Sequence, residues 1–365
     1  MNELAKFDHY LSDEGPAALV VREHLMPVEG TDGVLFPATF AAGDNFPGGY
    51  NIDGDPAGTN VCLIDSVGSQ ANRIEPIFAK DKYKALIPQI VVRAGEKQVN
   101  ILEAGHRAGD AIVRCSALQR ELQDAFKAVL KGNAEPMAKI APTSLVFGVW
   151  DSRDTQAKLP RLIASTIRAF DVRKLTRSAQ FIPAAEFVND KLLDEPVDKA
   201  MKDTYAQRGF IHVPASGSHG GVIPTGGIRR DATLGLAALR LLTAGSDEKK
   251  TLTLRRYILG LALTAFTYNP SGYLRQGCLL VLDPSKEREF VEVQYTGERK
   301  PGTVTHEAAL KFAMEAAKAF GVGVSKTVDF DRERAMKDVK GEGDTKTKRK
   351  RDKRADATPD TGENK

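Results

Sequence analysis

The chain has 365 residues, of which 42% are hydrophobic and 27% are charged. That length suffices for one large or two average domains, and this balance excludes a wholly disordered, fibrous or low-complexity protein. The formal net charge is +4, and residues 340–365 alone hold nine basic against six acidic residues, so the remainder is nearly neutral. An argument for nucleic-acid binding therefore depends on where basic residues cluster.

Cysteine usage and hydropathy favour a reducing, cytoplasmic location. Cys62, Cys115 and Cys278 lie far apart and include no CxxC pair, so neither a disulfide framework nor a sequence-local zinc site is predicted. The first ten residues lack the apolar core of a secretory signal, and the longest apolar run, 257–266, is too short to span a bilayer. We expect no membrane attachment, no cofactor and no bound metal.

Four helices are predicted from apolar residues that recur at helical spacing. Pro76 marks the end of the first, Gly132 and Gly321 can end the second and fourth, and Asp231 is a favourable N-cap for the third. The predicted ranges are 61–75, 118–132, 231–245 and the stretch between Thr305 and Gly321.

Six short strands are predicted from β-branched and aromatic runs bounded by Gly, Pro or Asp. Helices and strands do not alternate strictly, which predicts an α+β fold with an antiparallel sheet. The last two strands look like a hairpin across residues 283–289. The predicted strands cover residues 18–24, 89–93, 145–150, 210–213, 278–282 and 290–295.

Three further segments differ in composition from the rest. Residues 29–60 and 183–209 are rich in Gly, Pro and Asp or in charge, and we expect them to be long insertions that leave the sheet. Residues 339–365 have no apolar periodicity and predict a basic, disordered tail. The tail would either tether nucleic acid or serve only as a solubilising end.

One side of the first predicted helix is polar. Ser66, Ser69, Gln70 and Arg73 fall within a single sector when each residue turns the helix by 100°. Short hydroxyls, an amide and a guanidinium suit contacts to phosphate and sugar. A solvent-facing stripe is the alternative interpretation.

The densest basic region lies between residues 153 and 177, which contain seven basic residues and two acidic ones. Pro160 can begin a helix with Arg161 and Arg168 on its outer side. Arginine forks hold phosphates and stack on bases, which favours polyanion binding over a merely solvated basic face. Trp150 could stack a base but ends an apolar run, so a core position is favoured. The basic residues are Arg153, Lys158, Arg161, Arg168, Arg173, Lys174 and Arg177.

The segment 217–231 concentrates five glycines before the third predicted helix. Glycines permit close backbone approach and helix N-termini attract anions, so a cradle for phosphate or an RNA backbone is plausible, with a flexible connection as the alternative. Neither a Walker loop nor a dinucleotide fingerprint is present. The candidate contacts here are His219, Gly220, Gly221, Arg229 and Arg230.

Catalysis is the less favoured use of the same segment. His212 and His219 together would suit a metal-free ribonuclease that moves protons between two imidazoles. No HxH or HExxH pattern accompanies them, and we assign no catalytic or metal-binding residue.

Four stretches in combination resemble a known family. The sequence is similar, from about residue 19 to 320, to the backbone subunit of type I-G (formerly I-U) CRISPR surveillance complexes, which is the Cas-seven group of the RAMP superfamily. The stretches are DSVGSQANRIE (65–75), TSLVFGVWDSRD (143–154), KLPRLIASTIRAFDVRKLTRSAQF (158–181) and GGVIPTGGIRRDATLGLAALR (220–240).

This resemblance implies an RRM-like or ferredoxin-like palm with finger and thumb insertions over residues 1–338. It implies a non-enzymatic subunit whose copies assemble head-to-tail along a CRISPR RNA and present its spacer for pairing with target DNA. The further partners it implies are a large subunit and a Cas-five/Cas-six-type subunit. An RNA endonuclease acting on single-stranded RNA is the alternative, because related type III backbones cut RNA with a loop aspartate. A plain scaffold that binds acidic protein surfaces is a third possibility.

Overall fold

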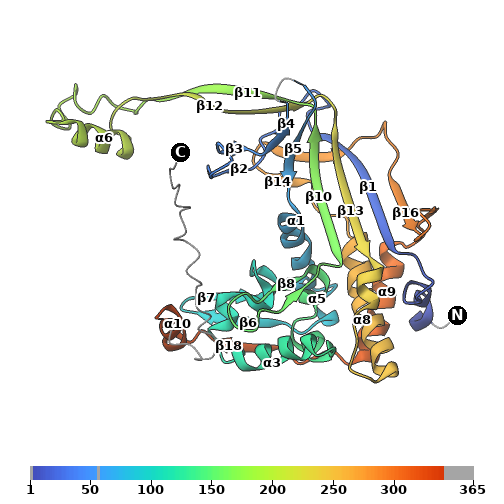
Figure 1. Ribbon diagram of the computed structural model, residues 1–365. Helices are drawn as coiled ribbons and strands as arrows, with labels where there is room; N and C mark the ends of the chain where they lie inside the picture. Colours follow the sequence, from blue (N-terminus) through green and yellow to red (C-terminus); the bar gives the residue numbers. More distant parts are fainter. Residues whose placement is uncertain (1–2, 56–57, 341–365) are drawn as a thin grey trace, which may run out of the picture.

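A large, curled antiparallel sheet forms the centre of the molecule (Figure 1). The computed structural model describes residues 3–55 and 58–340. The α+β class with an antiparallel sheet is confirmed. In spatial order the sheet contains β14 (Tyr273–Arg275), β15 (Cys278–Leu282), β1 (Ala18–Pro27), β13 (Ile228–Gly235), β10 (Ile163–Phe170), β5 (Asn60–Asp65) and β4 (Ile52–Gly54), with β16 (Glu289–Val293) and β17 (Arg299–Pro301) attached beside β1.

The predicted hairpin of the two C-terminal strands is wrong. β15 pairs with residues 25–27 of β1, and β16 pairs with residues 18–22 of the same strand. The two strands therefore lie end to end along one edge of β1. This arrangement is possible because β1, at 10 residues, is long enough to pair with two short strands in succession.

One end of the sheet packs on a helical body (Figure 1). A three-stranded sheet of β18 (Lys326–Asp329), β6 (Ile90–Ala94) and β7 (Lys97–Asn100) belongs to this body. One α-helix of the described residues, α6 (Lys199–Arg208), lies far from this body (Figure 1). The others are α1 (Val67–Ile74), α2 (Ala111–Arg114), α3 (Gln119–Leu130), α4 (Glu135–Ile140), α5 (Thr143–Phe147), α7 (Leu236–Arg240), α8 (Glu248–Thr267), α9 (His306–Phe320) and α10 (Arg332–Val339).

Two of the predicted helices are confirmed. α3 corresponds to the second, and α9 to the fourth, whose N-cap Thr305 accepts a hydrogen bond from the backbone N–H of Ala308. Sequence periodicity missed α8, the longest helix, because residues 257–266 are buried all round and leave no polar face to detect. No helix in the described ranges is both long enough and apolar enough to cross a bilayer.

Several other predicted elements are wrong in whole or in part, the helices among them because their apolar spacing also fits a strand. The range 61–75 is strand β5 followed by α1, and the range 231–245 begins inside β13, so Asp231 lies in a strand and caps no helix. The helix expected after Pro160 is strand β10. Residues 145–150 divide between α5 and β8 (Val149–Trp150), whereas 210–213 only reach the start of β12 (Val213–Pro224).

A long two-stranded ribbon projects from the other end of the sheet (Figure 1). It consists of β11 (Val172–Phe181) and β12, and residues 182–212, including α6, lie at its far end. We call residues 172–224 the arm, with the ribbon as its stem and residues 182–212 as its tip. The expected insertion at 183–209 therefore falls in the tip.

The other expected insertion, 29–60, stays closer to the sheet. It contains β2 (Thr39–Phe40) and β3 (Gly49–Tyr50), and it returns to the sheet edge as β4. Leu35 and Val222 exchange two backbone hydrogen bonds of 2.9 and 2.7 Å, which join this segment to the base of the arm. The basic tail predicted for 339–365 lies outside the described residues from 341 onward.

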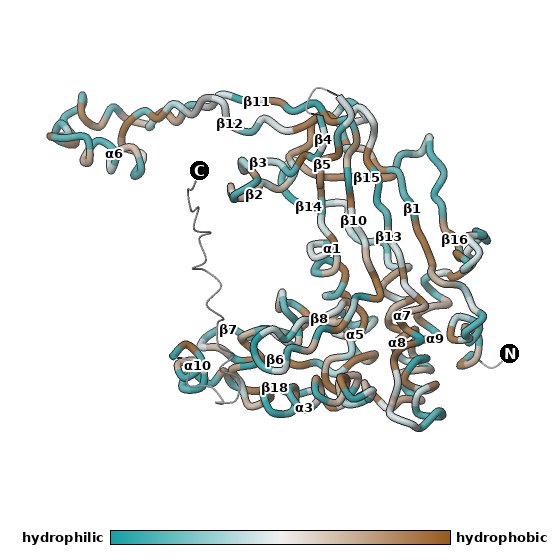
Figure 2. The backbone as a smooth tube through the Cα atoms, viewed as in Figure 1, coloured by the Kyte–Doolittle hydropathy of each residue, from teal (hydrophilic) through white to brown (hydrophobic). Residues whose placement is uncertain are grey.

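Two hydrophobic cores cover one face of the sheet, at different positions along the strands. The larger joins the strands to the helical body through Leu19, Val21 and Leu234, and the smaller contains Cys62, Ile167 and Ile228. In Figure 2 the hydrophobic stretches follow the strands and α8, whereas α6 is mainly hydrophilic. Between the two cores, the same face carries the buried ion pair of Glu23 and Arg230, opposite one another on β1 and β13.

The contact between α8 and α9 yields a test of the fold. A Cβ atom at Gly260 would lie 2.8 Å from the Ala313 Cα, so the two helix backbones meet without an intervening side chain. We expect Gly260→Val to lower the free energy of unfolding by about 1–3 kcal/mol through overpacking, measured by urea denaturation. Met314→Ala, at an exposed position of α9, should change it by less than about 0.5 kcal/mol. Equal effects of both variants would contradict this packing.

Candidate nucleic-acid interface

The buried carboxylate of Asp65 fixes α1 against the end of β5. Its oxygens accept hydrogen bonds from Ser69 Oγ at 2.7 Å, Gln70 Nε2 at 2.6 Å and Arg73 Nε at 3.1 Å. Arg275 Nη2, at the end of β14, approaches the same carboxylate at 3.3 Å. Three side chains of the predicted polar sector thus bond to one internal group, and Gln70 is itself buried.

The N-terminus of α1 is open. Ser66 is the N-cap, and its Oγ accepts a hydrogen bond of 3.2 Å from the backbone N–H of Ser69. A Cβ atom built on Gly68 would have no neighbour closer than Ser66 Oγ at 3.9 Å and Arg161 Nη2 at 4.0 Å. Free backbone N–H groups and the positive end of the helix dipole therefore face space beside a guanidinium. This is an arrangement that binds anions.

Arg161 is an exposed cation with no carboxylate to neutralise it. Among the residues that the structure describes, none forms an ion pair with its guanidinium, whose pKa is lowered by desolvation and by the nearby Arg107, against the opposing effect of Glu75. Gly148, at a φ of +75°, brings its backbone so close that a Cβ would lie 2.6 Å from Arg161 Cγ. The close approach of residue 148 fixes the base of the Arg161 side chain.

A buried ion pair supports this arrangement from behind. Arg107 Nε donates to Glu75 Oε2 at 2.5 Å, and Arg107 Nη1 donates to the Gly148 carbonyl at 3.3 Å. Burial outweighs the attraction of Arg107 and raises the pKa of Glu75 to about 7. Neither Arg107 nor Glu75 was singled out in the sequence, where no local pattern links residues 32 positions apart.

A short ribbon beside Arg161 exposes Trp150. β8 pairs with β9 (Lys158–Leu159), and Trp150 stands opposite Lys158. The Trp150 side chain is 58% exposed, so the expected core position is wrong. Lys158 Nζ lies 5.8 Å from the centroid of the indole ring, and Arg153 is exposed in the turn that joins the two strands.

The stem of the arm carries a second group of exposed cations. Arg173, Lys174 and Arg177 lie on β11 and are exposed. His219, opposite Thr176 on β12, packs with its ring centroid 5.0 Å from that of Tyr50.

The glycine-rich segment is part of a strand and precedes no helix. Residues 217–224 belong to β12, and after a turn the chain continues as β13. A Cβ on Gly220 would lie 2.6 Å from the Thr176 carbonyl carbon, and one on Gly221, at a φ of +98°, would lie 2.7 Å from the Leu35 carbonyl oxygen. These glycines permit close packing of backbones, so the expected helix start is wrong, and contact of Gly220 and Gly221 with RNA stays a prediction.

The structure separates the two histidines that a metal-free ribonuclease would need. His212 directly precedes β12, and His219 lies seven residues farther along the chain. A strand rises about 3.3 Å per residue, which places the two roughly 20 Å apart. In the ranges 3–55 and 58–340 no three His, Cys, Asp or Glu side chains gather as metal ligands would.

Adjacent arginines of β13 point to opposite faces of the sheet. Arg230 is buried on the core face and donates to Glu23 Oε2 at 2.6 Å. Arg229 lies on the outer face, where it donates to Asp231 Oδ2 at 2.8 Å. Arg168 shares this outer face and donates to Thr166 Oγ1 at 2.7 Å. The two arginines expected to act together at one loop are therefore not neighbours in space on one surface.

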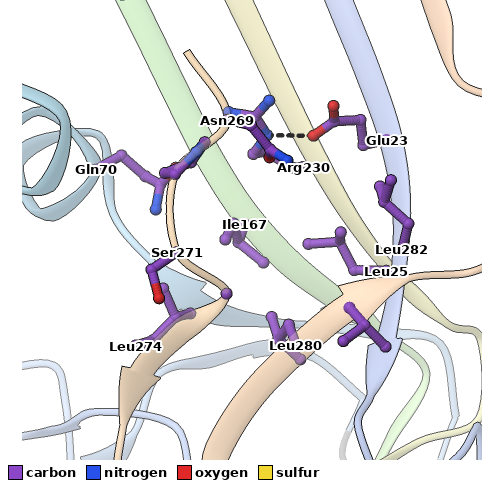
Figure 3. A pocket seen from close by; sticks show the side chains of 13 residues that line it. Glu23, Leu25, Gln70, Ile167, Arg230, Asn269, Ser271, Leu274, Leu280 and Leu282 are labelled. Carbon is purple, nitrogen blue, oxygen red and sulfur yellow. Dashed lines mark hydrogen bonds and ion pairs between the residues drawn. The ribbon is translucent and has the colours of Figure 1, made fainter. Parts of the chain in front are cut away.

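A pocket of about 310 Å³ lies between α1 and the ion pair on the sheet (Figure 3). Figure 3 shows Gln70 on one side of the pocket and the Glu23–Arg230 pair on the other, above apolar side chains that include Ile167 and Leu280. Its polar walls already have partners, because Gln70 Nε2 donates to Asp65 and Gln70 Oε1 accepts a bond of 3.0 Å from Ser165 Oγ. The apolar part of its lining belongs to the smaller core, which includes Ile167 and Leu280.

The structure thus divides the sequence candidates by their surroundings. Which of them touch RNA stays a prediction. The residues with free or exposed groups near α1 and the β8–β9 ribbon are Ser66, Arg153, Lys158 and Arg161; those on the arm are Arg173, Lys174, Arg177 and His219; and those with internal partners are Ser69, Gln70, Arg73 and Arg230.

The Asp65 carboxylate provides a test of how α1 is held. We expect Asp65→Ala to lower the free energy of unfolding by about 3 kcal/mol, because buried and half-buried donors lose their acceptor. Asp65→Asn keeps one acceptor oxygen and should lose less. Asp53→Ala, at an exposed position of β4, should stay within about 0.5 kcal/mol of the parent in the same urea titration. A loss at Asp65 no larger than at Asp53 would contradict this role.

Residues 19–174 match the family model described as CRISPR-associated protein GSU0053 (Cas_GSU0053). The matched region runs from β1 into β11 and contains α1, Trp150 and Arg161. No curated protein matches the chain. The family match agrees with the coarse part of the resemblance found in the sequence: over these residues, fewer than half of the chain, the protein is similar to a family of CRISPR-associated proteins.

Proposed function

We propose that this protein is a non-enzymatic subunit that binds a CRISPR RNA by its sugar–phosphate backbone and presents the spacer for pairing with target DNA. The proposal joins the CRISPR-associated family match to the surface around α1. In this role the central sheet acts as an RRM-like palm, and the arm acts as a finger or thumb. Copies assemble head-to-tail along the RNA in a type I-G complex, together with a large subunit and a Cas-five/Cas-six-type subunit.

The observation that carries the proposal is the unneutralised Arg161 beside the open N-terminus of α1. A phosphate there would meet backbone N–H groups, a serine hydroxyl and a guanidinium. None of these groups reads a base edge. A protein that coats guides of changing sequence needs this kind of contact, because base pairing supplies the sequence recognition.

The distribution of charge along the arm suggests that its stem and its tip have different roles. The stem has Arg173, Lys174 and Arg177 and no acidic residue, whereas the tip has six acidic and four basic residues. RNA therefore favours the stem and is repelled by the tip. The tip is suited to a protein contact, and a head-to-tail contact between copies would place the arm over the strand held by the next subunit.

Charge reversal at Arg161 tests the phosphate contact. We expect Arg161→Glu to weaken the binding of single-stranded RNA about tenfold or more, and to reduce the slope of log affinity against log salt by about 0.7, the value for one phosphate. Lys249→Glu changes the charge equally in the first turn of α8, at the opposite end of the molecule from the arm, and should bind like the parent (Figure 1). Fluorescence anisotropy over a salt series measures both quantities. An unchanged slope would count against Arg161.

Co-purification tests the proposed assembly. The chain is expressed with a CRISPR array and its neighbouring genes, and the particle is analysed for RNA of uniform length. We expect the parent and Lys249→Glu to retain this RNA, and the double variant Arg173→Glu/Arg177→Glu to lose most of it. Parent particles without RNA would refute the function, and RNA cut during incubation would favour the endonuclease alternative instead.

A further inference from the structure

Trp150 is a large aromatic side chain left exposed on a ribbon that also exposes basic residues. Its indole is 58% exposed, and the exposed cations Arg153, Lys158 and Arg161 lie in the same stretch of the chain. We infer that Trp150 and Lys158 form a stacking site for one base of a single-stranded RNA. This inference rests on the proposed function and adds a contact to the base plane that phosphate binding alone does not require.

The backbone that carries Trp150 is held rigidly. The Asp151 carboxylate, which is buried, accepts hydrogen bonds from the Thr155 N–H at 2.8 Å and the Thr155 hydroxyl at 2.6 Å. The Asp151 N–H donates to the Ala157 carbonyl at 2.9 Å. On the other side, a Cβ on Gly109 would lie only 3.2 Å from the Trp150 carbonyl oxygen. A site on such a fixed ribbon loses little backbone entropy when it binds.

The chemistry around the ring favours a nucleotide. Lys158 is the cross-strand partner of Trp150, and its ammonium lies 5.8 Å from the ring centroid. A base stacked on the indole can therefore place its own phosphate near an ammonium. Stacking uses the face of a base and leaves its hydrogen-bonding edges free, so the contact tolerates any sequence.

The acids of this ribbon do not cancel its positive charge. Asp151 is buried and bonded within the turn, which leaves the half-buried Asp154, bonded by Gln123 Nε2 at 2.9 Å, against the exposed Arg153, Lys158 and Arg161. The accessible charge next to the indole is thus basic. An aromatic side chain surrounded by cations suits a polyanion with aromatic rings better than it suits an apolar protein surface.

Trp150 is the only tryptophan of the chain, so intrinsic tryptophan fluorescence reports on this site alone. The full chain is titrated at low salt with a single-stranded RNA of mixed sequence, and separately with inorganic polyphosphate, which carries the charges without bases. We expect RNA to quench the emission in proportion to binding, as followed by anisotropy of the labelled RNA. Polyphosphate should leave the emission nearly unchanged.

Substitutions separate stacking from charge. Trp150→Ala should weaken RNA affinity roughly 5- to 100-fold, and Trp150→Phe should keep most of it, because phenylalanine retains an aromatic face. Both variants should keep the parent's salt slope and its affinity for polyphosphate. Leu130→Ala removes an equally exposed apolar side chain from the end of α3 and should bind RNA like the parent.

The possible failures are distinguishable. If RNA binds the parent without quenching Trp150, and Trp150→Ala binds it as tightly, the stacking site is refuted while the proposed function stands. If neither the parent nor any variant binds RNA at low salt, the proposed function fails, and the stacking site fails with it.

Discussion

The position of α1 depends on one buried carboxylate. Asp65 is the last residue of β5, and its two oxygens collect donors from Ser69, Gln70 and Arg73 on the first turns of the helix that follows. A buried carboxylate is costly unless its lone pairs are satisfied, so the strand end and the helix are held in a single relative geometry. The open N-terminus of α1 faces Arg161 only as long as this geometry persists.

The need to hold α1 in place gives the buried polar side chains of the sheet a role. The Glu23–Arg230 pair and the bonds from Ser165 through Gln70 to Asp65 cross the same face of the sheet, between two apolar cores. Replacing such groups by apolar residues often stabilises a protein, so they are weak evidence for stability. Here their role is positional: the network ties the sheet to α1, and it forms the polar side of the pocket whose apolar side belongs to the smaller core.

The sequence was a good guide where one face of an element is polar and a poor guide elsewhere. α9 and α3 have polar outer faces, and Thr305 and Gly321 mark the ends of α9 correctly. α8 has no such face over 257–266, and strands β10 and β13 bury every second residue, a spacing that short windows confuse with a helix. The α+β class survived these errors because it depends on the mixture of elements and not on each boundary.

The candidate site could likewise be predicted only in part from the sequence. Composition located the basic region between 153 and 177, but strand alternation decides which arginine is usable, and alternation could not be read while the segment was assigned to a helix. Arg229 and Arg230 show the consequence, since one residue of shift turns a surface cation into half of a buried ion pair. Asp65 could have been weighted more heavily from its place directly before the N-cap Ser66.

The arrangement of charge shows how a nearly neutral protein can hold a polyanion. Many of its cations face a carboxylate, as Arg22 faces both Asp231 and Glu289 on and beside the outer face of the sheet. Arg161 has no such partner in the described chain, and what distinguishes it from other unpaired cations is the helix terminus beside it, which adds to its positive potential. In the proposed function, affinity for RNA would come from a few sites left unneutralised, and repeating those sites in successive copies would multiply the effect without raising the net charge of any one subunit.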